Sequence, residues 1–179
     1  TAIRDLTREK HNEQEKLRLL HENTALKMSM QERYKFRELI GRSTAMQAAY
    51  ELISKAAATE YSVVISGAYG PGKELTSTPS HELSSRQHEP FITVNCGAVT
   101  ESLFEREFFG HRKGAFTDAR RDEPGYFDAA NKGTLFLDEI SEMHPAMQVK
   151  LLRVLENGEY IPVGDTLAKK ADVRIVAAT

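Results

Sequence analysis

Two short stretches carry residue types that act together on phosphate groups. The first, GAYGPGK at residues 67–73, has the spacing G-x-x-x-x-G-K, in which backbone N–H groups surround a phosphate and the lysine reaches its oxygens. The second, TLFLDE at 134–139, is an apolar run that ends in two carboxylates. We expect Asp138 to position Mg²⁺ and Glu139 to orient or deprotonate an attacking water. Together the two stretches predict nucleotide binding and phosphoryl transfer.

Each stretch also has a simpler interpretation. The first can be a glycine turn between a strand and a helix, and it departs from the usual pattern because Glu74, not Ser or Thr, follows Lys73. The second can be a turn that caps a helix. Their occurrence about 65 residues apart favours a nucleotide site. The predicted phosphate-binding residues are Gly67, Ala68, Tyr69, Gly70, Pro71, Gly72, Lys73 and Glu74.

The elements that must position these residues alternate between strand and helix. Apolar runs predict strands at 61–66, 91–95, 134–138 and 173–179. Helices are expected after the N-cap Ser43, from about Lys73, and from His144 to Asn157, where Gly158 ends the last one. This alternation predicts a parallel sheet with helices on its faces. Residues 96–133 are too long and glycine-rich for a simple connection, so we expect a functional insertion there.

The first 36 residues differ from the rest of the chain. They contain no Gly or Pro, carry dense mixed charge, and space their leucines like a coiled coil whose seam is interrupted by charged residues. A solvated helical linker and a short dimerising coiled coil both remain open. We therefore divide the chain into a helical segment at 1–36 and an ATPase-type domain at 37–179.

Composition excludes several classes of protein. Hydrophobic residues make up 40% and charged residues 28% of the 179 residues, and the net charge of −2 gives no strong field toward nucleic acid or membrane. The one cysteine, Cys96, fits a reducing cytoplasm, and no apolar run is long enough to span a membrane. Since the sequence stops on a strand pattern, we expect it to be part of a longer protein.

Several longer motifs resemble one family. The stretches FITVNCGAV, LFEREFFGHRKGAFTDA, GYFDAANKGTLFLDEISEMHPAMQVKLLRVLENGEY and DVRIVAAT, with the phosphate loop, resemble the AAA+ ATPase domain of sigma-54-dependent transcriptional activators (bacterial enhancer-binding proteins) from about residue 38 onward. The resemblance implies a three-layer αβα P-loop NTPase with a mostly parallel sheet, truncated before the family's helical lid and preceded by a helical linker. It also makes Glu74 an expected residue rather than an exception.

The resemblance further implies activity, cofactors and partners. We expect an ATPase that uses ATP and Mg²⁺, forms a homo-oligomer, usually a hexameric ring, and remodels sigma-54 RNA polymerase, with DNA contacted only through a domain absent from this chain. Lys73, Asn95 and Glu139 are the expected catalytic residues. Asn95 matches a switch residue that hydrogen-bonds the glutamate, although an ordinary strand-end asparagine is the alternative. The expected sigma-54-contacting residues are Gly114, Ala115, Phe116, Thr117, Asp118 and Ala119.

Four positions depart from the family pattern. Pro71 removes a backbone N–H from the phosphate loop, which predicts weaker nucleotide binding rather than its loss, and Pro79 predicts a kinked or short helix. Pro162 replaces an arginine that the resemblance links to hydrolysis, and Asp118 replaces a glycine at the tip of the GAFT-type loop. Two alternatives stay open: a nucleotide-binding regulatory protein with little hydrolysis, and a P-loop ATPase that remodels another protein.

Overall fold

The computed structural model describes residues 15–16, 19, 39, 41, 43–67, 70 and 72–179. It divides into two units, residues 1–40 and 41–179, close to the domain boundary drawn from composition. In the first unit Glu15, Lys16 and Leu19 are helical and exposed. The choice between a solvated linker and a coiled coil concerns residues 1–36, most of which lie outside the described set.

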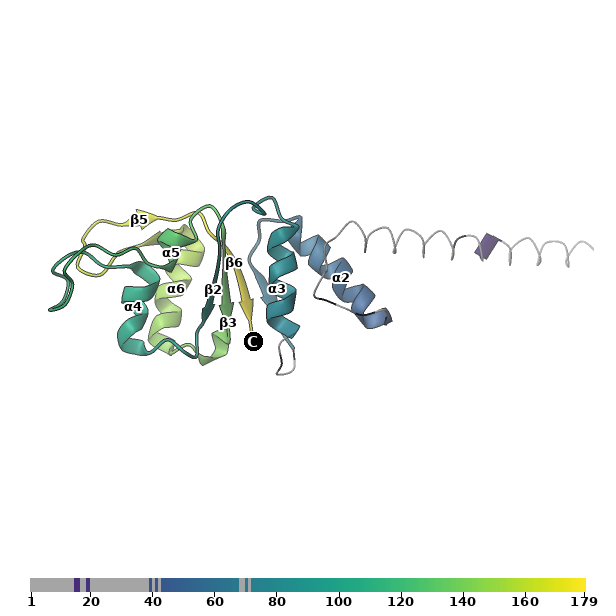
Figure 1. Ribbon diagram of the computed structural model, residues 1–179, viewed down its shortest axis with the longest axis horizontal. Coiled ribbons are helices and arrows are strands. Elements are labelled where there is room, and N and C mark those ends of the chain that lie inside the picture. The colour runs from purple at the N-terminus through teal and green to yellow at the C-terminus, as the bar shows by residue number, and fades with distance from the viewer. Residues whose placement is uncertain are drawn as a thin grey trace, which may run out of the picture. The chain divides into compact units, whose positions relative to one another are not determined.

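The second unit is built on a parallel four-stranded sheet. Its strands are β1 (Val63–Ile65), β2 (Phe91–Asn95), β3 (Thr134–Asp138) and β6 (Arg174–Ala178), in the spatial order β1-β6-β3-β2. Helices α2 and α3 cover one face, and α4, α5 and α6 cover the other (Figure 1). The predicted α/β class with a parallel sheet is therefore confirmed.

Helix α2 (Thr44–Ala57) begins at the predicted N-cap. The hydroxyl of Ser43 accepts the backbone N–H of Met46 at 3.3 Å, which satisfies one of the donors that a helix start leaves without a partner. Tyr50, Ile53 and Ala57 form its buried stripe. The strand that follows is less buried than its apolar run predicted, because β1 lies at the end of the described sheet and its Val64 side chain is 68% exposed.

Helix α3 (Gly72–Glu82) starts where predicted and continues through Pro79, so the expectation of a short first segment is wrong. Hydroxyls of the helix itself bond its carbonyls around the proline: Thr76 Oγ1 donates to the Gly72 oxygen and Ser80 Oγ to the Thr76 oxygen. Both bonds run from residue i to the carbonyl of residue i−4, the pattern by which Ser and Thr hydroxyls bond the backbone of their own helix.

The face covered by α4 (Glu101–Phe109), α5 (Tyr126–Ala129) and α6 (Pro145–Asn157) contains the main core. Phe104 and Phe108 stack with ring centroids 4.1 Å apart, and Phe109 stacks on Phe127 at 5.9 Å. Helix α6 has the predicted bounds, with Pro145 in its first turn and Gly158 ending it at a φ of 70°. The predicted insertion at 96–133 thus supplies two helices of the core and one exposed loop.

A small antiparallel ladder completes the unit. Strands β4 (Glu159–Tyr160) and β5 (Lys169–Lys170) pair across residues 161–168, which we call the 161–168 loop. We call the segment between α4 and α5 the 110–124 loop. His111 and Glu123 exchange two backbone hydrogen bonds of 2.9 Å at its base, so the ends of this loop are held together.

Candidate functional site

The predicted site begins at the carboxyl edge of the sheet. Strands β2 and β3 run parallel in a register that places Asn95 opposite Asp138. The backbone N–H of Cys96 donates to the Asp138 carbonyl at 2.9 Å, which extends the pairing past the strand ends. Open α/β sheets bind ligands at this edge. The two polar residues that the sequence predicted from separate motifs are therefore neighbours.

Glu139 has an uncommon backbone conformation. Its φ of 51° and ψ of 44° are left-handed, a region that costs a non-glycine residue about 1 kcal/mol or more. The Asp138 side chain supports this turn, because its Oδ1 accepts the Glu139 N–H at 2.9 Å. The short 3₁₀ helix Ile140–Glu142 follows at once. Such strain is concentrated at functional positions, where it directs a side chain.

Gly97 brings the side chains of the two strands together. A Cβ placed on Gly97 would lie 3.0 Å from Oε2 of Glu139 and 3.3 Å from Oδ1 of Asn95. Both polar groups therefore lie close to Gly97, where no side chain separates them. Gly97 was not among the predicted site residues, although a glycine two residues after a strand-end asparagine was a signal for such a close approach.

Cys96 lies beside these carboxylates and stays a neutral thiol. Burial raises its pKa to about 11, and the charges of Asp138 and Glu139 act in the same direction. The side chain is 5% exposed and belongs to the main core. Its structure agrees with a packing role.

The phosphate loop connects β1 to α3. Gly67, Gly70 and Gly72 are exposed, and no atom lies within 4 Å of a Cβ built on any of them, so the loop has room for an anion. Gly70 has a φ of 154°, which L side chains rarely adopt. Ala68, Tyr69 and Pro71 lie outside the described residues, and so does the predicted effect of Pro71.

Lys73 and Glu74 occupy the first turn of α3, which begins at Gly72. Lys73 is half-buried and Glu74 is exposed. The N-terminal N–H groups of an α-helix and its dipole favour an anion at this place. The loop is tied to the sheet, because the Gly67 N–H donates to the Thr179 carbonyl and the Thr179 N–H to that of Ile65.

The GAFT-type segment forms the tip of the 110–124 loop. The Gly114 N–H donates to the Ala119 carbonyl at 2.8 Å and closes the tip, while Ala119 itself is buried. Thr117 and Asp118 are exposed. Asp118 does not have a positive φ, so an aspartate occupies this position without left-handed backbone strain.

Phe116 is only partly exposed, at 37%. Its ring lies 4.8 Å from that of His111, and the Arg106 guanidinium lies 5.9 Å from its centroid. Two cations near the tip pair with other carboxylates: Arg112 pairs with Asp122 and Asp165, and Arg121 pairs with Glu123. In the described part of the chain no ion pair reaches Asp118.

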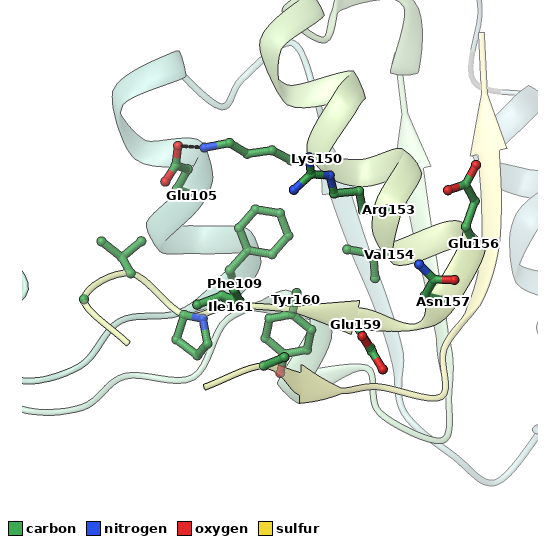
Figure 2. A pocket seen from close by; sticks show the side chains of 14 residues that line it. Glu105, Phe109, Lys150, Arg153, Val154, Glu156, Asn157, Glu159, Tyr160 and Ile161 are labelled. Atoms are coloured by element: carbon green, nitrogen blue, oxygen red, sulfur yellow. Dashed lines mark hydrogen bonds and ion pairs between the residues drawn. The ribbon is translucent and has the colours of Figure 1, made fainter. Parts of the chain in front are cut away.

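A cavity of about 680 Å³ lies away from the phosphate loop. It opens between α4, α6 and the 161–168 loop, with Phe109 and Tyr160 on its apolar side and Lys150 and Arg153 on α6 (Figure 2). None of the residues predicted for nucleotide or partner binding lines it.

Among the described residues, no group of three or more His, Cys, Asp or Glu side chains is arranged to hold a metal ion. In the same part of the chain, no helix has the length and apolar character needed to cross a bilayer.

Comparisons with known proteins find one family. Residues 39–179 match the family model described as the sigma-54 interaction domain. The nitrogen fixation protein AnfA of Azotobacter vinelandii is 46% identical over 165 residues, 92% of this chain and 31% of AnfA. The DNA-binding transcriptional regulator NtrC of Azospirillum brasilense is 48% identical over 141 residues, 79% of this chain and 29% of NtrC.

Solved structures agree with these relatives. The crystal structure of NtrX from Brucella abortus in complex with ADP superposes with a TM-score of 0.71 at 33% identity, covering 92% of this chain and 36% of NtrX. The ATP complex of the same protein gives a TM-score of 0.70. The chain therefore spans about a third of the length of the proteins it matches.

Proposed function

The chain belongs to the sigma-54 interaction domain family, and from that premise we propose that it is the ATP-hydrolysing part of a transcriptional activator that remodels sigma-54 RNA polymerase. The ATPase domain would comprise residues 37–179, preceded by the helical segment at 1–36. We further propose that the protein works in the cytoplasm as a homo-oligomeric ring, a hexamer by family resemblance. Contact with DNA would be made by another part of the longer protein.

The phosphate loop would hold the nucleotide. Its backbone N–H groups and the start of α3 suit the phosphates, with Gly67, Gly70 and Gly72 leaving the space in which they would lie. Lys73 would reach the β and γ oxygens. ATP, bound with Mg²⁺, would supply the phosphoanhydride bond whose cleavage would drive a conformational change of the protein. Ala68, Tyr69, Pro71 and Glu74 complete the proposed loop.

The edge of β2 and β3 would carry out the chemistry. We assign Asp138 to Mg²⁺ and Glu139 to the attacking water, which it would orient and deprotonate. Asn95 would control Glu139. Its Oδ1 already accepts the Ala98 N–H at 3.1 Å, so its amide N–H₂ is the group able to donate to the Glu139 carboxylate over Gly97.

The tip of the 110–124 loop would contact the protein partner. Gly114 to Ala119 form a closed turn, with Thr117 and Asp118 exposed and Phe116 partly exposed at its edge. An aromatic ring beside a hydroxyl offers both apolar area and a hydrogen bond to a partner surface. We propose that Phe116 and Thr117 are the principal contacts with sigma-54.

One observation carries the enzymatic proposal: Asn95 and Asp138, selected from two distant motifs, lie opposite each other at one edge of the sheet, and the side chains of Asn95 and Glu139 both lie close to Gly97. We expect Glu139→Gln to lower ATP turnover at least about 100-fold, because an amide cannot take a proton from water. Nucleotide binding should persist. Turnover and nucleotide affinity are measured in the full-length protein over a concentration range wide enough for assembly.

The control is Glu142→Gln, which removes a carboxylate three residues away on the same edge. Equal turnover in the two variants would contradict the role of Glu139. Nucleotide binding by the wild-type protein without turnover would instead favour the regulatory alternative. The identity of the partner is tested by measuring whether the protein captures sigma-54 in the presence of a transition-state mimic of ATP. If neither the wild-type protein nor Asp118→Gly captures sigma-54, the alternative of an ATPase that remodels another protein is favoured.

A further inference from the structure

The 161–168 loop lies directly against the base of the 110–124 loop. The Val163 N–H donates to the Gly110 carbonyl at 2.9 Å, and the Arg112 N–H donates to the Val163 carbonyl at 3.0 Å. Gly164, with a φ of 79°, approaches Ala115 so closely that a Cβ on it would lie 2.6 Å from the Ala115 Cβ. The second loop therefore touches the first where the GAFT-type tip begins.

The Arg112 guanidinium joins both loops by charge. Its Nε donates to Asp165 Oδ2 in the 161–168 loop at 2.6 Å, and its Nη1 donates to Asp122 Oδ2 in the 110–124 loop at 2.7 Å. Each carboxylate is also held by backbone N–H groups. Asp122 Oδ1 accepts that of Lys113, and Asp165 Oδ1 accepts those of Thr166 and Leu167.

A neighbouring arginine, Arg121, provides a comparison for the contacts of Arg112. Arg121, in the same loop, pairs with Glu123 two residues away, and its side chain is 82% exposed. That pair joins no other segment. The side chain of Arg112 is 43% exposed, and that of its partner Asp165 only 12%. Arg112 therefore connects two loops that are about 50 residues apart in sequence.

We infer that Arg112 is a positioning residue: through Asp165 it fixes the GAFT-type tip against the 161–168 loop, so that the two loops present one surface to the protein partner. That this surface binds a protein partner rests on the proposed function, whereas the coupling of the two loops does not. Arg112 is not among the residues proposed to bind nucleotide or sigma-54.

The coupling is tested by amide hydrogen exchange in the full-length protein. We expect Arg112→Gln to accelerate amide exchange in peptides from both loops about fivefold, because the ion pairs that hold the two loops together are lost. Arg121→Gln makes the same change of charge and should leave 161–168 unaffected. Equal exchange in that loop for wild type and both variants would overturn the inference.

The consequence for the partner is tested by sigma-54 capture with a transition-state mimic of ATP. Arg112→Gln should bind about threefold to tenfold more weakly than wild type, with basal ATP turnover retained. Asp165→Asn should have the same effect, and the double variant should be no weaker than either single one, since both act through one contact. Capture as strong as that of Arg121→Gln would contradict the positioning role. A wild-type protein that captures no sigma-54 would refute the proposed function, and exchange would still decide the coupling.

Discussion

The two faces of the parallel sheet are packed with different kinds of side chain. On the face of α4, α5 and α6, 17 buried residues form one apolar cluster, which includes two stacked pairs of phenylalanines. On the face of α2 and α3 the apolar cluster contains three buried residues, and α2 adds its own buried stripe of Tyr50, Ile53 and Ala57. This second interior also holds most of the buried polar side chains, namely Ser77, Ser80, His81, Ser84, Thr134 and Arg174.

The polar face is stabilised by directed contacts. Arg174 is 1% exposed, and its guanidinium donates to the carbonyls of Ser80 at 3.0 Å and Ala56 at 2.7 Å, while its Nε has no partner. Burial lowers the pKa of this arginine. His81 bonds Thr134 across to the sheet at 3.0 Å. Burying polar groups is tolerated only while such hydrogen bonds are kept.

The difference corresponds to the two proposed tasks. The 110–124 loop, which we propose contacts the partner, extends from the apolar face, where closely packed apolar side chains support its base. The phosphate loop extends from the face with the polar interior, whose helix α3 contains a proline and two buried serines near it. We expect the packing on the α2 and α3 face to contribute less to the free energy of unfolding. We also expect that contribution to be more sensitive to pH and to single substitutions of polar side chains.

The largest expected effect is on the apolar face. Phe108 is fully buried and contacts Phe104 and Tyr126. Phe108→Ala should lower the free energy of unfolding by about 3–5 kcal/mol, because it removes a large side chain and leaves a cavity. Phe91→Ala is the matched change on the other face, where the ring is half-buried and stacks on His81. Urea unfolding measures both, and an equal loss would contradict the contrast between the faces.

A smaller effect, of opposite sign, is expected on the polar face. Pro79→Ala restores a backbone donor inside α3, where an interior proline costs about 3 kcal/mol. Part of that gain is offset, because Pro79 is buried and because alanine leaves the unfolded chain more conformational freedom. We expect a net stabilisation of about 1 kcal/mol. Thermal unfolding measures it, and a loss of stability would show that the α3 face is packed around the proline ring.

The sequence predicted the apolar parts of this architecture well. Strands 91–95 and 134–138 and helix α6 have the predicted bounds, because their apolar periodicity is bounded by residues that start or stop an element. The polar interior was not predicted, since buried serines and an arginine have no periodic signal. Nor did the sequence indicate the left-handed Glu139 or the approach of Gly97, because both depend on segments that meet only in the folded chain.

The position of Pro162 illustrates the same limit. The resemblance relates this departure to hydrolysis, and that relation stays a prediction. The structure places Pro162 in the 161–168 loop, where it lines a small cavity with His111 and Arg112. The neighbouring Val163 pairs through its backbone with Gly110 and Arg112. Pairing between loops so distant in sequence has no local pattern, so the sequence could not predict this placement.

The smallest expected effect is a dependence on pH that belongs to the polar face. Burial lowers the pKa of His81, and the nearby positive charge of Arg174 acts in the same direction, against the opposing effects of the Glu89 backbone and Glu82. The unfolded chain, with a histidine pKa of about 6.5, therefore takes up a proton first as the pH falls. The stability contributed by neutral His81 is present above about pH 6.5 and is lost below it, by less than about 1.4 kcal/mol per pH unit.

Urea unfolding between pH 7.5 and 5.5 measures this loss, in a window above the range in which the carboxylates titrate. His81→Gln should unfold at lower urea concentration at every pH but with a flatter pH dependence, because it removes the titrating group. The exposed His88→Gln is the control and should keep the wild-type slope. If His81→Gln keeps the wild-type dependence of unfolding free energy on pH, the pH-sensitive group lies elsewhere. The two faces would then differ in their packing but not in their sensitivity to pH.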